Sequence, residues 1–232
     1  MSVLCIRLAM TWTILCGLIL FLVIPNTVVS EDQWLMHSEK TWDKEWKSGA
    51  WEYLETVAVE RSRIAVIGGV LIPMYAAKNA SVLEVGCGEG AITDYFPAAQ
   101  KASYVGLDIS KEAIHAAKKA RGPPMKFVHA AAHNFQPTHK FDAVVFSEVL
   151  YYVEYEKVLA QYREYLNPNG IVIISIFRQG ETQLYENIFQ HARTVFSQID
   201  EMDISGMFRR KKGAKLEKTA FRLEVYRLKN KK

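Results

Sequence analysis

From residue 81 onward, short apolar runs alternate with amphipathic stretches. The runs are four to seven residues long and rich in Val, Ile, Leu and Phe. Continuous rather than alternating hydrophobicity is typical of strands that are covered on both faces, as in a parallel sheet. We therefore predict five strands, at Val82–Val85, Ser103–Leu107, Met125–His129, Phe141–Phe146 and Ile171–Phe177.

Helical patterns fill the intervals between these runs. Lys111–Ala120 follows Ser110, which is a suitable N-cap, and Tyr155–Leu166 and Glu181–Phe196 are two further predicted helices. The Asn-Pro-Asn-Gly sequence at 167–170 predicts a turn. Strands that alternate with helices predict right-handed crossovers and a doubly wound α/β sheet.

Two extended stretches end the chain, around Ile199–Ile204 and at Ala220–Leu228. The second alternates apolar and charged residues, which is typical of an antiparallel edge hairpin. The basic sequence at 209–215 is then the hairpin loop. With these two strands the fold class is a seven-stranded Rossmann-like α/β sheet with an antiparallel final hairpin.

The N-terminus is a separate piece. Residues 8–24 contain no charge, and as a helix they would span roughly 25 Å, a little less than the roughly 30 Å hydrocarbon layer of a membrane. The segment is interpreted as an uncleaved signal anchor, as a signal peptide cleaved after 28–30, or as a buried core helix. The sequon Asn79-Ala80-Ser81 is a candidate glycosylation site, which would favour a luminal domain.

Between this segment and the strands lies a region rich in tryptophan and tyrosine. Trp42, Trp46 and Tyr53 fall near helical spacing, which predicts an amphipathic helix across the main domain. Another helix is predicted at 64–77, with Arg61 and Arg63 at its start. The predicted organisation is a hydrophobic helix within 1–30, a helical cap at 31–63 and an α/β domain at 64–232.

Composition and charge exclude several protein classes. The 232 residues are 50% hydrophobic and 23% charged, which excludes a disordered chain. Residues 209–232 carry eleven Lys/Arg against two Asp/Glu, so the basic excess belongs to the C-terminus and we expect no nucleic-acid partner. Three cysteines, two of them in the apolar N-terminus, form neither a disulfide framework nor a metal site.

The first predicted strand runs into a glycine-rich turn, Val-Leu-Glu-Val-Gly-Cys-Gly-Glu-Gly at 82–90. Glycines at 86, 88 and 90 allow a tight turn and let the backbone approach a ligand closely. Asp108 ends the next strand, twenty positions beyond Gly88. A carboxylate at that place can accept both hydroxyls of a ribose, as in dinucleotide-binding folds.

These residues resemble the class I S-adenosylmethionine (SAM)-dependent methyltransferases. Leu-Glu-Val-Gly-Cys-Gly-Glu-Gly is similar to their first motif, and the segments at 104–110, 141–153 and 166–177 are similar to their second-, fourth- and fifth-strand motifs. The resemblance covers about residues 40–228. The starts of the cap and of the fourth-strand motif also resemble small-molecule methyltransferases near the nodulation N-methyltransferases.

The resemblance implies SAM as cofactor and a set of residues that bind it. Glu84 and the glycine turn would face the methionine part, Asp108 the ribose and Ile109 the adenine. The family commonly has an acid at the position of Ala131, so either His133 or the backbone near Ala132 replaces that contact, or the adenine is held more loosely. The implied cofactor residues are Glu84, Gly86, Cys87, Gly88, Gly90, Asp108, Ile109, Ala132, His133 and Ser147.

Methyl transfer from a sulfonium requires a nucleophile aligned opposite sulfur in a site with little water. A hydroxyl acceptor needs a general base, whereas a neutral amine can attack first and lose its proton afterwards. Glu148, Tyr151 and Tyr152 beyond the fourth strand, with His133 across the cleft, are the candidate catalytic residues. Trp42, Trp46, Trp51 and Tyr53 are the candidate lid and substrate residues.

The expected function is methyl transfer from SAM to an oxygen or nitrogen of a small molecule, with a secondary metabolite as the expected acceptor. Two alternatives stay open: a membrane-anchored enzyme that acts on a lipid or peptide, and a non-catalytic SAM-binding module. The N-terminal helix would make a membrane the other partner. The sequence indicates neither the acceptor nor the oligomeric state.

Overall fold

The computed structural model describes residues 37–178, 183–209 and 215–229. The apolar segment 8–24, for which we predict a membrane anchor or a signal peptide, lies outside these residues, as does most of the predicted hairpin loop. In the part of the chain that is described, none of the helices has the length and apolar character needed to cross a membrane.

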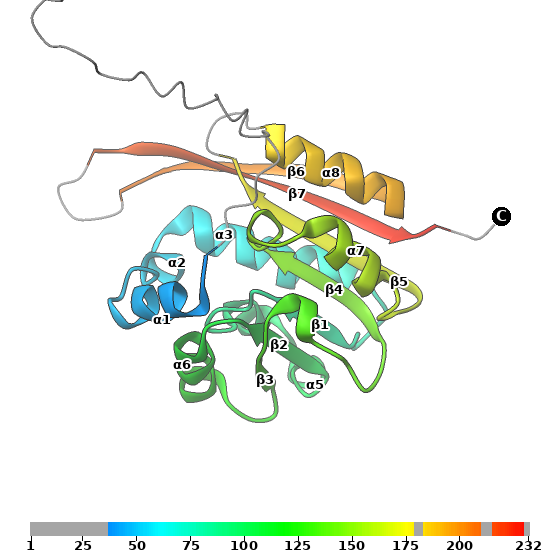
Figure 1. Ribbon diagram of the computed structural model, residues 1–232, viewed down its shortest axis with the longest axis horizontal. Coiled ribbons are helices and arrows are strands. Elements are labelled where there is room, and N and C mark those ends of the chain that lie inside the picture. The colour runs from blue at the N-terminus through cyan, green and yellow to red at the C-terminus, as the bar shows by residue number, and fades with distance from the viewer. Residues whose placement is uncertain (1–36, 179–182, 210–214, 230–232) are drawn as a thin grey trace, which may run out of the picture. The chain divides into compact units, whose positions relative to one another are not determined.

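The core of the protein is one seven-stranded sheet with the order β3-β2-β1-β4-β5-β7-β6 (Figure 1). The first five strands are parallel, β7 runs antiparallel to β5, and β6 runs antiparallel to β7. The predicted fold class is thereby confirmed. The strands are β1 (Val82–Val85), β2 (Tyr104–Asp108), β3 (Lys126–His129), β4 (Phe141–Ser147), β5 (Leu166–Phe177), β6 (Phe196–Phe208) and β7 (Glu217–Leu228).

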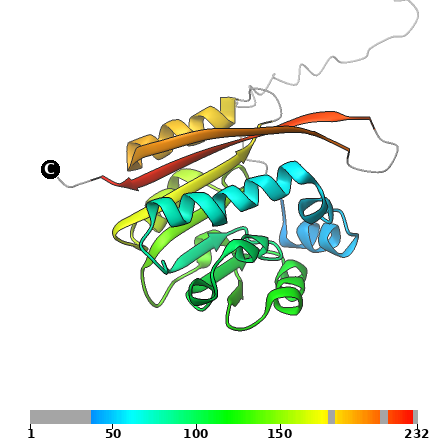
Figure 2. The same cartoon turned by 180° about the vertical axis from the view of Figure 1, so that it is seen from behind.

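Helices cover both faces of this sheet. Alternate strand residues enter two separate apolar clusters, one beneath α7 and α8 and the other beneath α3, α4 and α6. Helices α7 and α8 lie over the face seen in Figure 1, and the long cyan helix of α3 and α4 crosses the face seen in Figure 2. The α-helices are α1 (Glu39–Lys47), α2 (Tyr53–Thr56), α3 (Ala58–Val66), α4 (Ile72–Tyr75), α5 (Ala98–Lys101), α6 (Lys111–Arg121), α7 (Tyr155–Arg163) and α8 (Gln183–Val195), with a π-helical segment at Ile67–Leu71.

The helix that we predict from residue 64 in fact begins at Ala58. Arg61 and Arg63 therefore lie inside α3 rather than at its start. Val57, in an extended conformation, separates α2 from α3 and sets this boundary. The predicted border between the cap and the α/β domain falls within α3, so the described part of the cap is continuous with the main domain.

The Asn-Pro-Asn-Gly turn is part of β5 instead of a separate connection. Leu166 already pairs with Phe141, and the register shifts between Phe141 and Ala143. Asn169 has a φ of 66°, and the Asn167 amide donates a hydrogen bond to Asp142 over 2.8 Å. The predicted helix at 155–166 ends at Arg163, because residues 164 and 165 form a turn and Leu166 already belongs to β5.

Candidate active site

The glycine turn follows β1 directly, at the carboxyl end of that strand. Gly88 has a φ of 52°, and a Cβ atom there would lie 3.1 Å from the Trp46 ring. Gly90 has a φ of 76°, and its Cβ would lie 2.5 Å from the Phe127 ring. A side chain at Gly88 would thus press against Trp46 of α1, whereas one at Gly90 would clash with Phe127 within the domain.

Asp108 is fixed in place at the end of β2. The backbone N–H groups of Gly88 and Ser110 donate hydrogen bonds to its two carboxylate oxygens, over 2.9 and 2.8 Å. Burial raises the pKa of Asp108, although these two N–H groups oppose the shift. The carboxylate is therefore oriented by the glycine turn before any ligand arrives, as a ribose-binding acid requires.

Glu84 is a buried carboxyl group on β1, only 4% exposed. The Tyr104 hydroxyl donates to its Oε2 over 2.6 Å. Burial raises the pKa of Glu84 to about 8, and the Tyr104 hydrogen bond and Arg63 only partly offset that rise. At neutral pH the group is mostly protonated in the absence of a nearby ligand cation.

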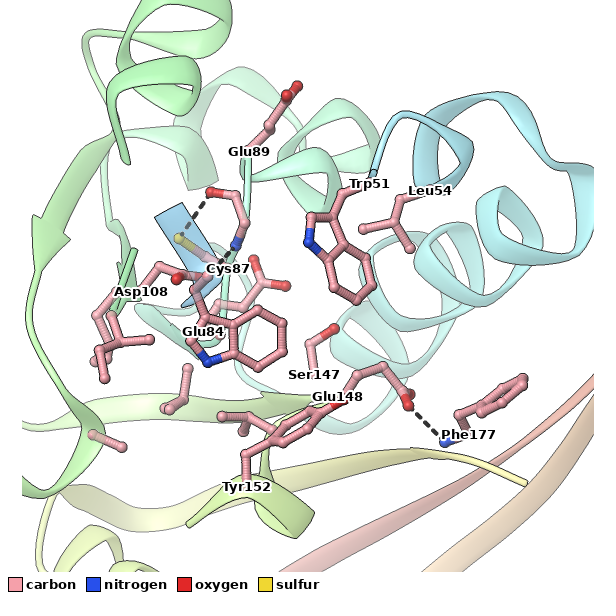
Figure 3. Close-up of a pocket in the computed structure, with 18 of the residues that line it drawn as sticks. Trp51, Leu54, Glu84, Cys87, Glu89, Asp108, Ser147, Glu148, Tyr152 and Phe177 are labelled. Carbon is pink, nitrogen blue, oxygen red and sulfur yellow. Dashed lines mark hydrogen bonds between the residues drawn. The ribbon is translucent and has the colours of Figure 1, made fainter. Parts of the chain in front are cut away.

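A cavity of about 1100 Å³ opens at the carboxyl ends of the strands. In Figure 3, Cys87 and Asp108 lie toward one end, Phe177 toward the other, and Trp51 and Ser147 between them. Every predicted site residue except Gly90 lines this cavity: Trp42, Trp46, Trp51, Tyr53, Glu84, Gly86, Cys87, Gly88, Asp108, Ile109, Ala132, His133, Ser147, Glu148, Tyr151 and Tyr152.

The loop after β3 borders the cavity where the family commonly places an acid. Ala132 is buried, and its carbonyl accepts a hydrogen bond from the Tyr162 hydroxyl over 2.9 Å. His133 is exposed at the cavity wall. Tyr162 of α7 thus holds the backbone of this loop. The roles of Ala132 and His133 toward adenine stay predictions.

Glu148 follows β4 and is held by several donors. Its backbone has a φ of 56°, and its carboxylate accepts hydrogen bonds from the Ser175 hydroxyl, the Phe177 N–H and the Tyr151 hydroxyl. The Arg63 guanidinium lies 3.8 Å away. Both oxygens therefore already have partners within the protein, and a substrate would have to displace one of them to reach this carboxylate.

The two tyrosines of this loop are not available as bases at neutral pH. Burial raises the pKa of Tyr151 well above its usual range and that of Tyr152 to about 12. Both phenols are therefore protonated at neutral pH. They form part of the cavity wall, while the catalytic role that we predict for them stays untested.

Glu60 and Arg63 also line the cavity, and we did not predict them as site residues. Both are buried on α3, with the Arg63 guanidinium 3.4 Å from Glu60 and donating a hydrogen bond to the Ser147 hydroxyl over 3.0 Å. Burial lowers the pKa of Arg63, but Glu148 and Glu60 more than compensate, so it stays charged. One feature of the sequence could have indicated them: Glu60 and Arg63 are opposite charges three residues apart, and each is next to an apolar residue, Val59 or Ile64.

Residues 39–56, which comprise α1, α2 and their connection, form a lid along the cavity. Trp42 makes an edge contact with Tyr152 at 4.9 Å between ring centres. The Asp43 carboxylate accepts from the Ser110 hydroxyl over 2.7 Å and from the Glu112 N–H. Arg121 is 2.7 Å from Glu55. The lid is thus joined to both the strand ends and α6.

Asn79, the candidate glycosylation site, is exposed and has a φ of 57°. It lies just before β1, at the opposite end of that strand from the glycine turn. Within the described parts of the chain, no group of three or more His, Cys, Asp and Glu side chains is arranged to hold a metal ion.

Comparison with known proteins gives matches to methyltransferases. A methyltransferase domain matches residues 82–170. Nodulation protein S of Rhizobium tropici is 27% identical over 72% of this chain and 69% of its own length. Malonyl-[acyl-carrier protein] O-methyltransferase of Halalkalibacterium halodurans is 28% identical over 52% of this chain, which covers only 48% of that protein.

Among solved structures, N-methyltransferase NodS of Bradyrhizobium japonicum WM9, in complex with S-adenosylhomocysteine (SAH), has a TM-score of 0.64. The likeness covers 81% of this chain and 98% of NodS at 18% identity, so it shows a shared fold. SAH is the product that SAM leaves after transfer. Fold, glycine turn, oriented Asp108 and domain match agree, and this chain is a class I SAM-dependent methyltransferase, similar to the nodulation proteins.

Proposed function

We propose that the enzyme methylates a nitrogen atom of a small organic amine. The observation that carries this proposal is the hydrogen bonding of Glu148. It is the carboxylate nearest the end of β4, where the acceptor is expected, and both of its oxygens already accept hydrogen bonds. The relatives include enzymes named for N- and O-methylation, so their names leave the choice open.

The chemistry of the acceptor connects this observation to nitrogen. A hydroxyl needs a base to remove its proton, whereas the lone pair of a neutral amine attacks directly. As the new N–C bond forms, the methyl–sulfur bond breaks with its electron pair on sulfur. The resulting ammonium group then releases its proton to solvent. No step requires Glu148, Tyr151 or Tyr152 to accept a proton.

The far end of the cavity suits the charge that develops on nitrogen. Aromatic side chains from the lid and from β5, β6 and β7 line it, together with buried Glu60. Over the whole cavity, eight Asp/Glu, one of them the mostly protonated Glu84, stand against two Lys/Arg. Ring faces and carboxylates stabilise an ammonium ion and the transition state that leads to it. The rings are Tyr53, Phe177, Phe208 and Phe221, of which Phe221 also contacts the Arg63 guanidinium.

The size of the cavity supports a small-molecule acceptor beside the cofactor. Its volume of about 1100 Å³ is slightly above the roughly 300–1,000 Å³ that is usual for a pocket that holds one ligand. When bound, SAM supplies an activated methyl group. The glycine turn, Asp108 and Glu84 would hold it at one end, which leaves the aromatic end for a second molecule.

The test uses pairs of acceptors that differ only in the nucleophile. Full-length protein in detergent is incubated with SAM and with tryptamine or tryptophol, and with benzylamine or benzyl alcohol. Methylated product and SAH are measured by mass spectrometry, and Asp108→Ala is the control for cofactor binding. We expect methylation of the amine in each pair. Methylation of the alcohols with the amines inert would overturn the proposal.

We further propose that residues 8–24 anchor the enzyme to a membrane. The support is the absence of any charge over seventeen residues. Extraction of cell membranes with carbonate should leave the intact chain in the pellet and release a Leu18→Arg, Leu20→Arg variant. Recovery of the intact chain in the soluble fraction would refute the anchor.

The anchor favours one second candidate for the acceptor, namely a lipid amine or a membrane-associated peptide. Activity that appears only with detergent-dispersed phosphatidylethanolamine would support this alternative over a soluble amine. If the soluble amines are methylated, we propose that the natural acceptor is a secondary metabolite.

A further inference from the structure

The last two strands of the sheet form a hairpin whose end extends past α8. Strands β6 and β7 pair along their whole lengths, and Figures 1 and 2 show the ends at Phe208 and Glu217 well beyond that helix. One face of the hairpin packs inward at this end. Phe208 is buried, and a Cβ atom at Gly206 would lie 3.1 Å from Val59 of α3. The other face therefore points away from α3.

The outward face carries two exposed apolar side chains. Met207 pairs with Lys218, and Leu216 stands two residues before Lys218, so the three side chains share this face. Met207 is 56% exposed and Leu216 is 42% exposed. Farther along the same face, Tyr226 is buried in the cluster beneath α8. Two neighbouring apolar side chains do not specify a partner by themselves, so the charge around them decides.

The residues around this apolar pair are basic. Arg209 and Lys215 are exposed and flank the connection between the two strands, and Lys218 follows. In the sequence, positions 209–218 contain six Lys/Arg against one Asp/Glu. Nearer the middle of the hairpin the charges are matched, since Asp203 accepts a hydrogen bond from Arg222 over 3.0 Å. The positive charge is therefore concentrated at the end of the hairpin.

We propose that this end of the hairpin docks on the surface of a membrane that contains anionic lipids. The hairpin tip comprises Met207, Arg209, Lys215, Leu216 and Lys218. Basic side chains are attracted to acidic headgroups, and exposed apolar side chains among them enter the boundary between headgroups and acyl chains. A nucleic acid would attract the same cations but would leave the apolar pair in water. The combination therefore favours a membrane.

Docking would bring the aromatic end of the cavity close to the membrane. Phe208, the residue after Met207, lines that end, and its ring centre lies 6.3 Å from that of Tyr53 in the lid. An acceptor that concentrates at the membrane surface would then enter the site beside its source. The proposal rests neither on nitrogen as the methylated atom nor on the anchor at 8–24, because the hairpin tip is a separate part of the chain.

The test measures co-sedimentation of full-length protein with vesicles of phosphatidylcholine alone and of phosphatidylcholine with about 30% phosphatidylserine. Every protein carries Leu18→Arg and Leu20→Arg, so that the apolar segment at 8–24 does not itself hold the chain on both kinds of vesicle. We expect binding to the anionic vesicles at roughly 0.1 M salt and its loss at about 0.5 M, because salt screens the attraction.

The cations are tested with Lys215→Gln and Lys218→Gln together. This variant should bind the anionic vesicles about twenty- to thirtyfold more weakly, because each cation near the surface contributes to the attraction. Lys118→Gln with Lys119→Gln is the matched control. It removes two exposed lysines of α6 and so changes the net charge equally, and it should change binding less than about twofold.

The apolar pair is tested with Met207→Ser and Leu216→Ser together. This variant keeps every charge and should bind the anionic vesicles about tenfold more weakly. Binding as tight as that of the parent would show that charge alone acts, which would overturn the proposal of a membrane partner. Binding of a short DNA duplex without binding of anionic vesicles would assign the hairpin tip to nucleic acid and would also overturn it.

Two results with the lysines or the vesicles would be equally decisive. Equal binding to both kinds of vesicle, or equal binding by the Lys215→Gln, Lys218→Gln variant and the α6 control, refutes the proposal. None of the four substituted residues of the hairpin tip lines the cavity. Binding of SAH, measured by calorimetry and expected to equal that of the parent, therefore verifies that each variant is folded.

Discussion

Glu84 should make cofactor binding depend steeply on pH. Its carboxyl group has a pKa of about 8 in the ligand-free protein because it is buried. The resemblance to class I enzymes places the methionine part of SAM beside it, where an ammonium group would favour the carboxylate. Binding therefore requires that Glu84 lose a proton, and affinity for SAH should rise as the pH increases.

The magnitude follows from the pKa. Removing the proton at pH 7, one unit below a pKa of about 8, costs about 1.4 kcal/mol, and at pH 6 it costs about twice as much. Affinity for SAH should therefore be about tenfold higher at pH 7 than at pH 6. About one proton should be released on each binding event over this range.

Calorimetry in buffers of different ionisation enthalpy measures both the affinity and the released proton. Glu84→Gln should flatten the pH dependence. Tyr104→Phe removes a hydrogen bond that lowers the Glu84 pKa, so the rise in affinity should move to higher pH. A change of less than twofold between pH 6 and pH 7, or an unchanged profile in Glu84→Gln, would refute this reasoning.

Three further predictions concern the turn, the ribose acid and the lid. Asp108→Ala should weaken SAH binding by a hundredfold or more in calorimetry, and an unchanged affinity would remove it from the site. Gly90→Ala should lower the free energy of unfolding in urea by about 1–3 kcal/mol because its Cβ would meet Phe127; a loss below 0.5 kcal/mol would contradict this. Arg121→Gln should release Glu55, which should speed proteolysis of the lid and raise KM for SAM about three- to tenfold. An unchanged rate of proteolysis would show that the ion pair of Arg121 with Glu55 does not hold the lid.

The sheet was predictable because its strands carry their own signal. Runs such as Phe141–Phe146 and Ile171–Phe177 are apolar except for Asp142 and Ser175, since both faces of the parallel sheet are covered. The glycine turn and Asp108 were predictable for a similar reason, because their chemistry depends on positions close together in sequence. Boundaries were less predictable: the Asn-Pro-Asn-Gly segment is held in β5 by a tertiary contact to Asp142.

The chemistry at the acceptor end could not be inferred from sequence. Glu148 looks like a base because a carboxylate follows a strand, yet its partners Ser175 and Phe177 lie 27 and 29 residues further along the chain. Arg63 reaches the cavity only because α3 packs across the sheet. Contacts of this kind depend on the packed fold, and local pattern does not reveal them.

Ser110 joins the lid to the cofactor site, so docking of the lid and binding of SAM should be thermodynamically linked. Its N–H orients Asp108, while its hydroxyl holds Asp43 of the lid. If docking of the lid raises the affinity for SAM by some factor, SAM must raise the docking equilibrium by the same factor. Amide hydrogen exchange in α1, measured with and without SAM, should therefore give a coupling free energy equal to the binding energy that Asp43→Asn forfeits.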